Sequence, residues 1–219
     1  MASKIILLSG PVNSGKTTLA GSLQQRYSFA HFKTHDAIKA QRPKVDEERG
    51  AMQSAGEWLD KSTNGRWVAD AVAREAIDLD DNAVIIVDAV RIKEQVDGLR
   101  EAFGKRVVHV HLTAPDAVLA DRYSTRKSRI KEFKTYAEVK RNKTESQVDD
   151  LKQYADIVID SRRSTPGAVV VRVAAHLGLY GRGYERLVDV LVGGQFGSEG
   201  KGNIASYLAE EYQVLMRVG

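Results

Sequence analysis

The sequence predicts an α/β fold in which a parallel sheet is covered by helices on both faces. Short apolar runs of strand length alternate with longer segments of helical period along most of the chain, as expected of consecutive strand–helix–strand units. The first apolar run leads into a glycine-containing loop, which leads in turn into a helix-competent segment. No apolar stretch approaches the roughly 20 residues of a membrane span.

The individual elements follow from their residue patterns. Predicted strands are apolar runs of four to seven residues, at residues 4–9, 30–34, 83–87, 106–112 and 157–160. Predicted helices have apolar residues three and four apart, at residues 16–27, 46–62, 66–77, 93–103, 115–123, 136–151 and 167–177. Pro115 and Pro166 stand at helix starts, where a fixed φ helps and a missing N–H costs nothing. Thr113 is a candidate cap for the helix that follows Pro115.

Residues 10–17 read Gly-Pro-Val-Asn-Ser-Gly-Lys-Thr, which is the G-x-x-x-x-G-K-[ST] spacing of a phosphate-binding loop between a strand and a helix. Gly10 and Gly15 allow the backbone to turn its N–H groups toward phosphate oxygens, next to the positive end of the helix dipole. We expect Lys16 to reach the β- and γ-phosphates of ATP and Thr17 to ligate Mg²⁺. The candidate nucleotide-binding residues are Gly10, Asn13, Ser14, Gly15, Lys16, Thr17 and Thr18. The sequence therefore predicts a P-loop NTPase.

The composition excludes some classes of protein but does not identify a substrate. The chain of 219 residues has no cysteine and a net charge of +4, which excludes disulfides and cysteine-based zinc sites and agrees with a reducing cytoplasm. The first strand begins at residue 4, so we expect no signal peptide and a cytoplasmic protein. The mild basic charge suits a nucleic-acid binder or a protein that handles small polyanions. We expect small-molecule nucleotides as partners, no membrane and no direct nucleic-acid binding, and a homodimer stays open.

A buried strand that ends in a carboxylate lies downstream of the loop. Residues 84–88 read Val-Ile-Ile-Val-Asp and continue through Ala-Val to Arg91. With the His-Val-His-Leu run at 109–112 and the apolar run at 155–161, this region resembles the P-loop deoxynucleoside monophosphate kinases over about residues 1–178. The resemblance implies ATP- and Mg²⁺-dependent phosphoryl transfer to a nucleoside monophosphate, with a deoxynucleotide favoured. It places Asp88 near Mg²⁺, together with Thr17, or near the attacking oxygen.

A basic segment follows between residues 122 and 143. It holds nine Lys and Arg side chains against Glu132 and Glu138, namely Arg122, Arg126, Lys127, Arg129, Lys131, Lys134, Lys140, Arg141 and Lys143. Bringing two polyanions together requires cations from several directions. In the kinase family this position is the lid that closes over ATP. Arg122, Arg126 and Arg129 are the candidate catalytic arginines, and a solvated helix surface is the alternative for most of the others.

On the acceptor side, Arg49 and Arg91 are candidates for holding a 5′-phosphate. Asp36 follows the short strand 30–34 and is expected near the acceptor or, alternatively, as a helix N-cap. Trp58 and Trp67 are expected in the core or in the wall of the acceptor pocket. His109 and His111 share one face of a strand, so a metal pair is conceivable, but no third ligand is in view and a structural role is favoured.

The composition changes at residues 178–184, where three glycines fall within six residues. This break predicts a kinase-like domain at 1–178, a linker at 179–186 and a second segment at 187–219 that opens with a strand at 187–192. The second segment contains a glycine-rich loop with a lysine, at Gln195, Gly197, Ser198, Glu199, Gly200, Lys201 and Gly202. It is similar to the start of adenylosuccinate synthetase, whose G-D-E-G-K-G loop implies GTP and a purine nucleotide as ligands.

Two departures from that second family matter. Ser198 stands where the family has the loop aspartate that acts as a base, and a hydroxyl does not accept a proton at neutral pH. Some viral relatives that start from deoxyguanylate resemble this serine form, so a guanylate-type acceptor is favoured for any complete protein. About thirty residues cannot form that enzyme, so the segment is expected to be a truncated start that is inert alone.

Three interpretations of the whole chain follow. The leading one is a nucleoside monophosphate kinase. A synthetase-type purine nucleotide ligase with an auxiliary front domain is the second, and a regulatory nucleotide-binding module without phosphoryl transfer is the third. The presence of Lys16, Thr17 and Asp88 argues against the third.

Overall fold

The computed structural model describes residues 4–46, 48–125, 135–141, 143–179, 190–194, 200–209 and 214–217. Contacts divide the chain into two compact units, Met1–Leu177 and Gly178–Gly219. In the part of the chain that the structure describes, we find no helix with the length and apolar character needed to cross a membrane.

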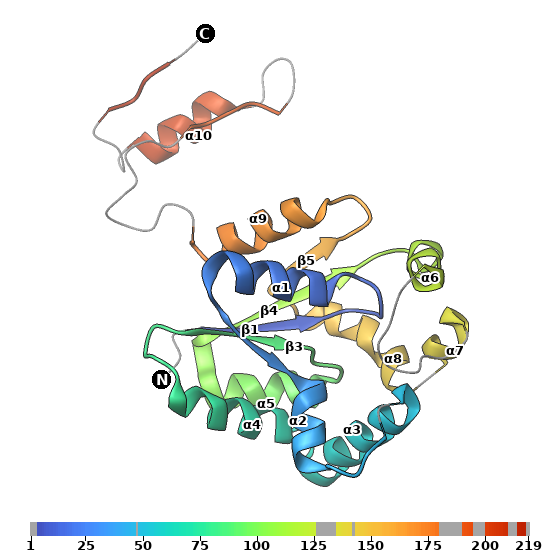
Figure 1. The fold of residues 1–219 in the computed structure, drawn as a ribbon. Helices are drawn as coiled ribbons and strands as arrows, with labels where there is room; N and C mark the ends of the chain where they lie inside the picture. Colours follow the sequence, from blue (N-terminus) through green and yellow to red (C-terminus); the bar gives the residue numbers. More distant parts are fainter. Residues whose placement is uncertain are drawn as a thin grey trace. The chain divides into compact units, whose positions relative to one another are not determined.

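The first unit is built on a five-stranded parallel sheet (Figure 1). The strands lie in the order β2-β3-β1-β4-β5 and comprise β1 (Lys4–Ser9), β2 (Ala30–Lys33), β3 (Val84–Asp88), β4 (Val107–Thr113) and β5 (Ile157–Asp160). The central strand β1 has β3 on one side and β4 on the other. The chain passes from β1 to β2 on the β3 side, whereas β3 connects to β4 on the other side of β1. The direction of the connections therefore reverses at β1, and open α/β sheets bind ligands at the carboxyl ends of the strands at such a point.

Helices cover both faces of this sheet, and the predicted α/β class is confirmed. On one face α1 (Lys16–Tyr27) packs against α9 (Pro166–His176), and on the other α4 (Trp67–Glu75) packs against α5 (Lys93–Phe103) (Figure 1). Because both faces are covered, β1 reads as a continuous apolar run, and Ile5, Ile6, Leu7 and Leu8 are fully buried. At the carboxyl end of the sheet lie α3 (Arg49–Thr63), α6 (Asp116–Ser124) and α7 (Tyr136–Lys140) (Figure 1).

Several predicted elements differ from those observed. A helix α2 (Thr34–Gln41) follows β2 directly and begins at the last residue of the predicted strand. The sequence did not indicate this helix because it contains few apolar residues. The predicted helix 136–151 is three elements, α7, α8 (Lys143–Val148) and the 3₁₀ turn η3 (Asp149–Tyr154). The chain must turn there because Val139 packs with Val12 and Tyr123, whereas Leu151 belongs to the main core.

Smaller corrections concern helix ends. The helix predicted at 46–62 begins at Arg49, and the one predicted at 66–77 ends at Glu75 and continues as the 3₁₀ turn η1 (Ala76–Asp78). A further 3₁₀ turn, η2 (Gly104–Arg106), precedes β4. Thr113 does not cap α6, since the N-cap is Pro115 and this helix start has no side-chain cap hydrogen bond. In contrast, Thr165 caps α9 by accepting a hydrogen bond from the Ala168 N–H at 3.2 Å.

The second unit contains one described helix, α10 (Lys201–Leu208), which starts after Gly200 at a φ of +73°. The strand predicted at 187–192 is not found at Val190–Val192, which have no regular structure in the described ranges. These three side chains are exposed, so no buried face holds them in a sheet. Residues 187–189 lie outside the described residues.

Candidate functional site

The loop after β1 has the backbone geometry of a phosphate cradle. Gly10 has a φ of +131°, and a Cβ there would lie 2.1 Å from the carbonyl oxygen of Leu112 in β4. Gly15 has a φ of +103° and Asn13 one of +66°. Only glycine fits at position 10, because neither the loop nor the neighbouring strand has room for a side chain. The loop then enters α1 at Lys16, so its N–H groups and the helix N-terminus lie together.

Two polar groups in the loop are suited to an anion. Lys16 Nζ donates to the carbonyl oxygens of Gly10 at 2.6 Å and Pro11 at 2.8 Å, and the residue is 8% exposed. The hydroxyl of Ser14 is buried without a hydrogen-bond partner in the structure as described. A buried unpaired polar group in a loop of turned N–H groups is what a bound phosphate would satisfy.

Asp88 lies beside this loop because β3 is the neighbour of β1, with Leu8 and Asp88 paired in register. Burial raises the pKa of the Asp88 carboxyl, but hydrogen bonding from His31, the charge of Lys16 and the Thr17 hydroxyl together outweigh it and hold the pKa below its ordinary value. The carboxyl is therefore ionised at neutral pH. An ionised carboxylate beside a threonine hydroxyl is a donor set that suits Mg²⁺.

His31 belongs to this site, although no pattern in the sequence selects it. Its Nε2 lies 3.4 Å from Asp88 Oδ2, and the two side chains are 6% and 10% exposed. A second neighbour, Thr34, lies within hydrogen-bonding distance of the carbonyl oxygens of Asp88 and Ala89, at 3.3 Å each. The position of Asp88 is thus fixed from β2 and from the start of α2.

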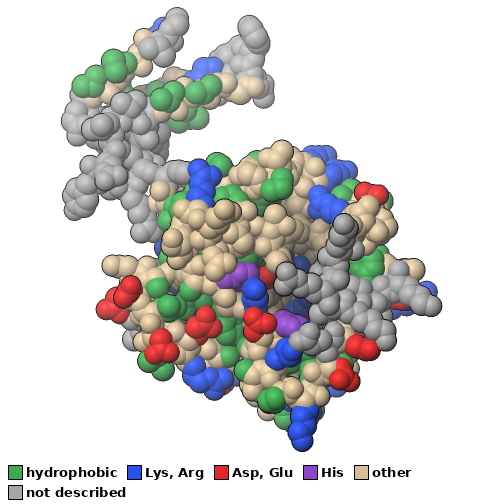
Figure 2. All heavy atoms as spheres, in the orientation of Figure 1, with side chains coloured by type: hydrophobic (Ala, Val, Ile, Leu, Met, Phe, Trp, Pro, Cys, Tyr) green, Lys and Arg blue, Asp and Glu red, His purple; other side chains and the backbone are tan. Residues whose placement is uncertain are grey.

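A cavity of about 850 Å³ extends from the phosphate loop to α2 and α3. Figure 2 shows acidic, basic and histidine side chains mixed on one face of the molecule. The cavity brings together most of the predicted site residues in the first unit, namely Asn13, Gly15, Lys16, Thr17, Thr18, Asp36, Arg49, Asp88, Arg91 and Arg122. Gly10 and Ser14 belong to the same loop but do not line the cavity.

Gly200, Lys201 and Gly202 belong to the second unit, where they stand at the start of α10. Several predictions lie outside the described residues, namely Arg126, Lys127, Arg129, Lys131, Lys134, Gln195, Gly197, Ser198 and Glu199.

Arg122, on α6, lies where it can act on a nucleotide. Its guanidinium donates to the carbonyl oxygen of Asn13 at 3.2 Å, to Ser161 Oγ at 2.9 Å and to Ser161 O at 3.0 Å. It therefore ties the phosphate loop to the segment after β5 while it lines the cavity.

The acceptor candidates differ in their surroundings. Arg91 forms an ion pair with Glu145 of α8, whose side chain is 3% exposed. Arg49 is 8% exposed at the start of α3. Asp36 lies in the first turn of α2, whose N-cap is Lys33, so the N-cap interpretation of Asp36 is wrong. Its carboxylate lies where the helix dipole favours negative charge.

A hydrogen-bonded network of side chains that the sequence did not single out forms another wall of the cavity. Asp60 Oδ1 accepts from Trp67 Nε1 at 2.7 Å and from Gln95 Nε2 at 2.8 Å, and Gln95 Oε1 accepts from the Arg91 N–H at 2.8 Å. Burial raises the pKa of Asp60 more than these hydrogen bonds lower it. Trp67 is therefore both core and pocket wall, whereas Trp58 is 54% exposed with the Arg42 guanidinium 4.4 Å from its ring centroid.

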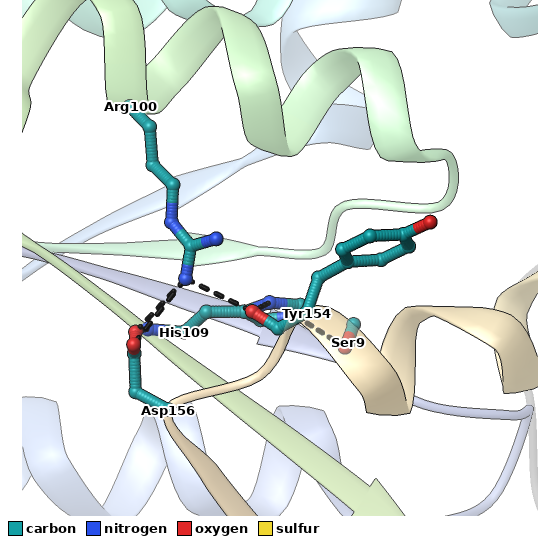
Figure 3. A network of polar contacts seen from close by, with 5 residues as sticks. All are labelled: Ser9, Arg100, His109, Tyr154 and Asp156. Carbon is teal, nitrogen blue, oxygen red and sulfur yellow. Dashed lines mark hydrogen bonds and ion pairs between the residues drawn. The ribbon is translucent and has the colours of Figure 1, made fainter.

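The two strand histidines form a structural network around Ser9, and Figure 3 shows the part of it that contains His109. Ser9 Oγ lies 2.7 Å from His109 Nε2 and 2.9 Å from His111 Nδ1, and His109 Nδ1 lies 3.2 Å from the Tyr154 carbonyl oxygen. Since a carbonyl only accepts, His109 donates through Nδ1 and accepts the Ser9 hydroxyl hydrogen through Nε2. Ser9 Oγ is then free to accept from His111 Nδ1–H.

Burial lowers the pKa of both histidines to about 4, so they are neutral at pH 7. Asp156 extends the network by accepting from the His109 N–H at 2.7 Å and from Arg100 at 3.3 Å (Figure 3). Among the described side chains we find no group of three or more His, Cys, Asp or Glu arranged to hold a metal. The hydrogen bonds give these histidines the structural role that the sequence favoured.

Comparison with solved structures shows a P-loop kinase-like fold. A sugar kinase from Janibacter sp. HTCC2649 has a TM-score of 0.53 at 20% identity, covering 81% of this chain and 96% of its own. Shikimate kinase from Aquifex aeolicus has a TM-score of 0.53 at 18% identity over 80% of this chain and 96% of its own. A gluconokinase from Sinorhizobium meliloti 1021 has a TM-score of 0.53 at 17% identity, over 81% and 97%. No curated protein matches the sequence.

At sequence identities of 20% or less, this similarity establishes the fold only. The substrate has to be inferred from the residues of the site. The sequence match is more specific about family. Residues 6–141, more than half of the chain, match the AAA domain, and this stretch contains the phosphate loop, Asp88 and Arg122. The chain belongs to the AAA domain family.

Proposed function

We propose that the chain is an ATP- and Mg²⁺-dependent kinase that transfers a phosphoryl group to a nucleoside monophosphate, with a deoxynucleoside monophosphate favoured. One observation carries the proposal. A single cavity is lined by Lys16, Thr17 and Asp88 and also by Arg49 and Arg91. A triphosphate and a second phosphorylated molecule can therefore be bound in the same cavity, as phosphoryl transfer requires.

On the donor side, the loop N–H groups would hold the triphosphate, and Lys16 would exchange its two carbonyl partners for phosphate oxygens. Thr17 and Asp88 would hold Mg²⁺, directly or through water. The metal supplies positive charge that offsets the charge developing on the transferred group. Arg122, which is bonded to the loop at Asn13 O, would supply further positive charge.

On the acceptor side, Arg49 and Arg91 would bind the 5′-phosphate and bring one of its oxygens to the γ-phosphorus. That oxygen forms the new P–O bond while the bond to the ADP oxygen breaks. Because the attacking phosphate oxygen is already ionised, no strong base is needed. Arg49 and Arg91 line the same cavity as Asp88, and their charges would offset the repulsion between the phosphates of the two bound molecules.

A hydroxyl-bearing small acceptor is the second candidate. Besides Asp88, the carboxylates of Asp36, Glu57 and Asp60 line the same cavity, and a carboxylate can take the proton from an attacking hydroxyl. The similar folds include a sugar kinase, a shikimate kinase and a gluconokinase.

A coupled assay of ADP release separates the two candidates. The chain is screened with ATP and Mg²⁺ against all ribo- and deoxynucleoside monophosphates, and against shikimate and gluconate. We expect turnover with at least one deoxynucleoside monophosphate and none with Lys16→Ala. Turnover with a hydroxyl acceptor alone would replace the first candidate by the second. ATP consumption by Lys16→Ala at the wild-type rate would refute the assigned site.

We also propose that residues 187–219 are the opening of an adenylosuccinate synthetase-like domain after a linker at 179–186. The helix that starts at Lys201 after left-handed Gly200 supports a glycine loop followed by a helix. We expect no synthetase activity with GTP, aspartate and inosinate from this chain. In a complete protein, Ser198 favours a guanylate-type acceptor, which competition between inosinate and deoxyguanylate would test.

A further inference from the structure

Gln53 on α3 has a buried side-chain amide whose hydrogen bonds are missing. The residue lines the cavity, yet both Nε2 and Oε1 are buried without a partner in the part of the chain that the structure describes. Such unpaired amides are rare in folded proteins because burial removes their hydrogen bonds to water. A molecule bound in the cavity would supply the missing partners, because glutamine can turn its amide toward it about three side-chain torsions.

The position of Gln53 on α3 indicates what that molecule contains. Arg49, Gln53 and Glu57 follow one another at intervals of four, so they lie along one face of the helix, about 6 Å apart per step, and all three line the cavity. The face therefore offers a cation, an amide with donor and acceptor, and a carboxylate in succession. A ligand with an anion at one end and polar ring atoms further along fits this order.

The walls around Gln53 suit a flat apolar ring. Ile38, Met52 and Trp67 line the same cavity, and Trp67 is held in place by its bond to Asp60. Gly56 lies within the helix on this side, where an added Cβ would be 3.4 Å from Ile38 Cδ1. Glycine inside a helix lowers its stability, so the space it leaves beside Gln53 is consistent with room for a ligand.

From these observations we infer that Gln53 is a specificity-determining residue that pairs through both amide atoms with the donor–acceptor edge of a heterocyclic base. The acceptor is then a base-bearing phosphate, not a polyol. A planar carboxamide matches a base edge because donor and acceptor lie side by side in one plane on both partners. This inference rests on the proposed function, because it takes the cavity to be the acceptor site.

Gln95 provides a matched control for the stability of the chain. It is a second buried glutamine of the same cavity, 3% exposed, but its amide bonds Asp60 and the Arg91 N–H. Replacing an unpaired buried amide by an apolar chain of similar length should stabilise the protein, whereas replacing a paired one should destabilise it. We expect Gln53→Met to raise the Tm by about 3 °C and Gln95→Met to lower it by at least as much. A fall in Tm for Gln53→Met would overturn the inference.

Binding of small molecules provides the second readout. The chain has two tryptophans, and Trp67 lines the cavity, so its fluorescence reports binding. Wild type and Gln53→Met are titrated with the four deoxynucleoside monophosphates, with deoxyribose 5-phosphate, which lacks a base, and with ATP. We expect Gln53→Met to weaken the best-bound nucleotide about tenfold or more, and to leave deoxyribose 5-phosphate and ATP within about twofold.

The results that would overturn the role of Gln53 differ from those that would overturn the proposed kinase activity. An equal loss for the nucleotide and for deoxyribose 5-phosphate would overturn a base contact, as would unchanged affinity for both. A wild-type chain that binds none of the five acceptor probes would overturn it as well. If nucleotides bind in the expected pattern but no ADP is released, the kinase proposal fails while the role of Gln53 in base recognition stands.

Discussion

Lowering the pH from 7 to 5 should destabilise the first unit through the buried histidines behind the phosphate loop. His109 and His111 are neutral in the folded chain because burial lowers the pKa of each to about 4. In the unfolded chain each takes up a proton near its ordinary pKa of about 6.5. The unfolded state therefore binds more protons between these values, so the stability present above pH 6.5 is lost as the pH falls toward 4.

The size of the effect follows from the same numbers. A fall in pKa from 6.5 to about 4 corresponds to roughly 3 kcal/mol for each histidine when it is fully expressed. Between pH 6.5 and 5 the slope should be about 1 kcal/mol per pH unit for each histidine, and about 2 for the pair if they titrate independently. Asp60, whose pKa burial raises, contributes with the opposite sign at lower pH, so the slope is best measured above pH 5.

Urea unfolding at half-unit pH steps gives the free energy of unfolding and its slope. His111→Asn removes one titrating group while its amide can still donate to Ser9, so the slope should fall by about half. His176→Asn, at an exposed position of α9, is the control and should retain the wild-type slope. Equal slopes for wild type and His111→Asn would refute the proposed origin of the pH dependence.

Four further predictions concern the site and the chain end. Lys16→Ala should lose ATP affinity and turnover by about 3 kcal/mol or more, measured as Kd and kcat/KM, and near-wild-type turnover would contradict its role. Asp88→Asn should keep ATP binding largely intact while kcat falls, and no change in either would make Asp88 structural. Gly10→Ala should lower the free energy of unfolding by more than about 3 kcal/mol, because its Cβ meets the Leu112 carbonyl and its φ is positive; urea unfolding with a loss below about 1 kcal/mol would show that the loop can relax. Deleting residues 184–219 should leave ADP release unchanged, and a loss of activity in the folded deletion variant would show that the second unit contributes to the site.

The strands and the phosphate loop could be predicted because their signals are local. A parallel strand covered on both faces is a continuous apolar run, as in β1 and β3, and the glycines at 10 and 15 are required by backbone angles within the loop itself. The helix α2 could not be found in this way, because its residues show little apolar periodicity. Its place is set instead by the preceding strand β2 and by the packing of Ile38. The break in the helix predicted at 136–151 likewise depends on tertiary packing, because Val139 and Leu151 belong to two different hydrophobic clusters.

The same distinction applies to the site residues. Lys16, Thr17 and Asp88 were found because a motif or a strand end marks them. His31, Gln53, Asp60 and Gln95 acquire their roles from side chains that are distant in the sequence, so no local pattern selects them. One signal was available for Gln53, the four-residue spacing from Arg49 to Glu57 on one helix face, which turns three polar side chains in the same direction.

The bonds from Lys16 to the carbonyl oxygens of Gly10 and Pro11 have a consequence for which anions the loop accepts. The ammonium already has two internal acceptors, so an incoming ligand must compete with the chain's own backbone. A singly charged anion such as chloride offers little beyond what the carbonyls provide. A polyphosphate offers several charged oxygens that can engage the lysine and the loop N–H groups at once. The backbone thus acts as a competitive internal ligand that sets a threshold of charge and size, and the loop should discriminate against the abundant small anions of a cell before any base or sugar is recognised.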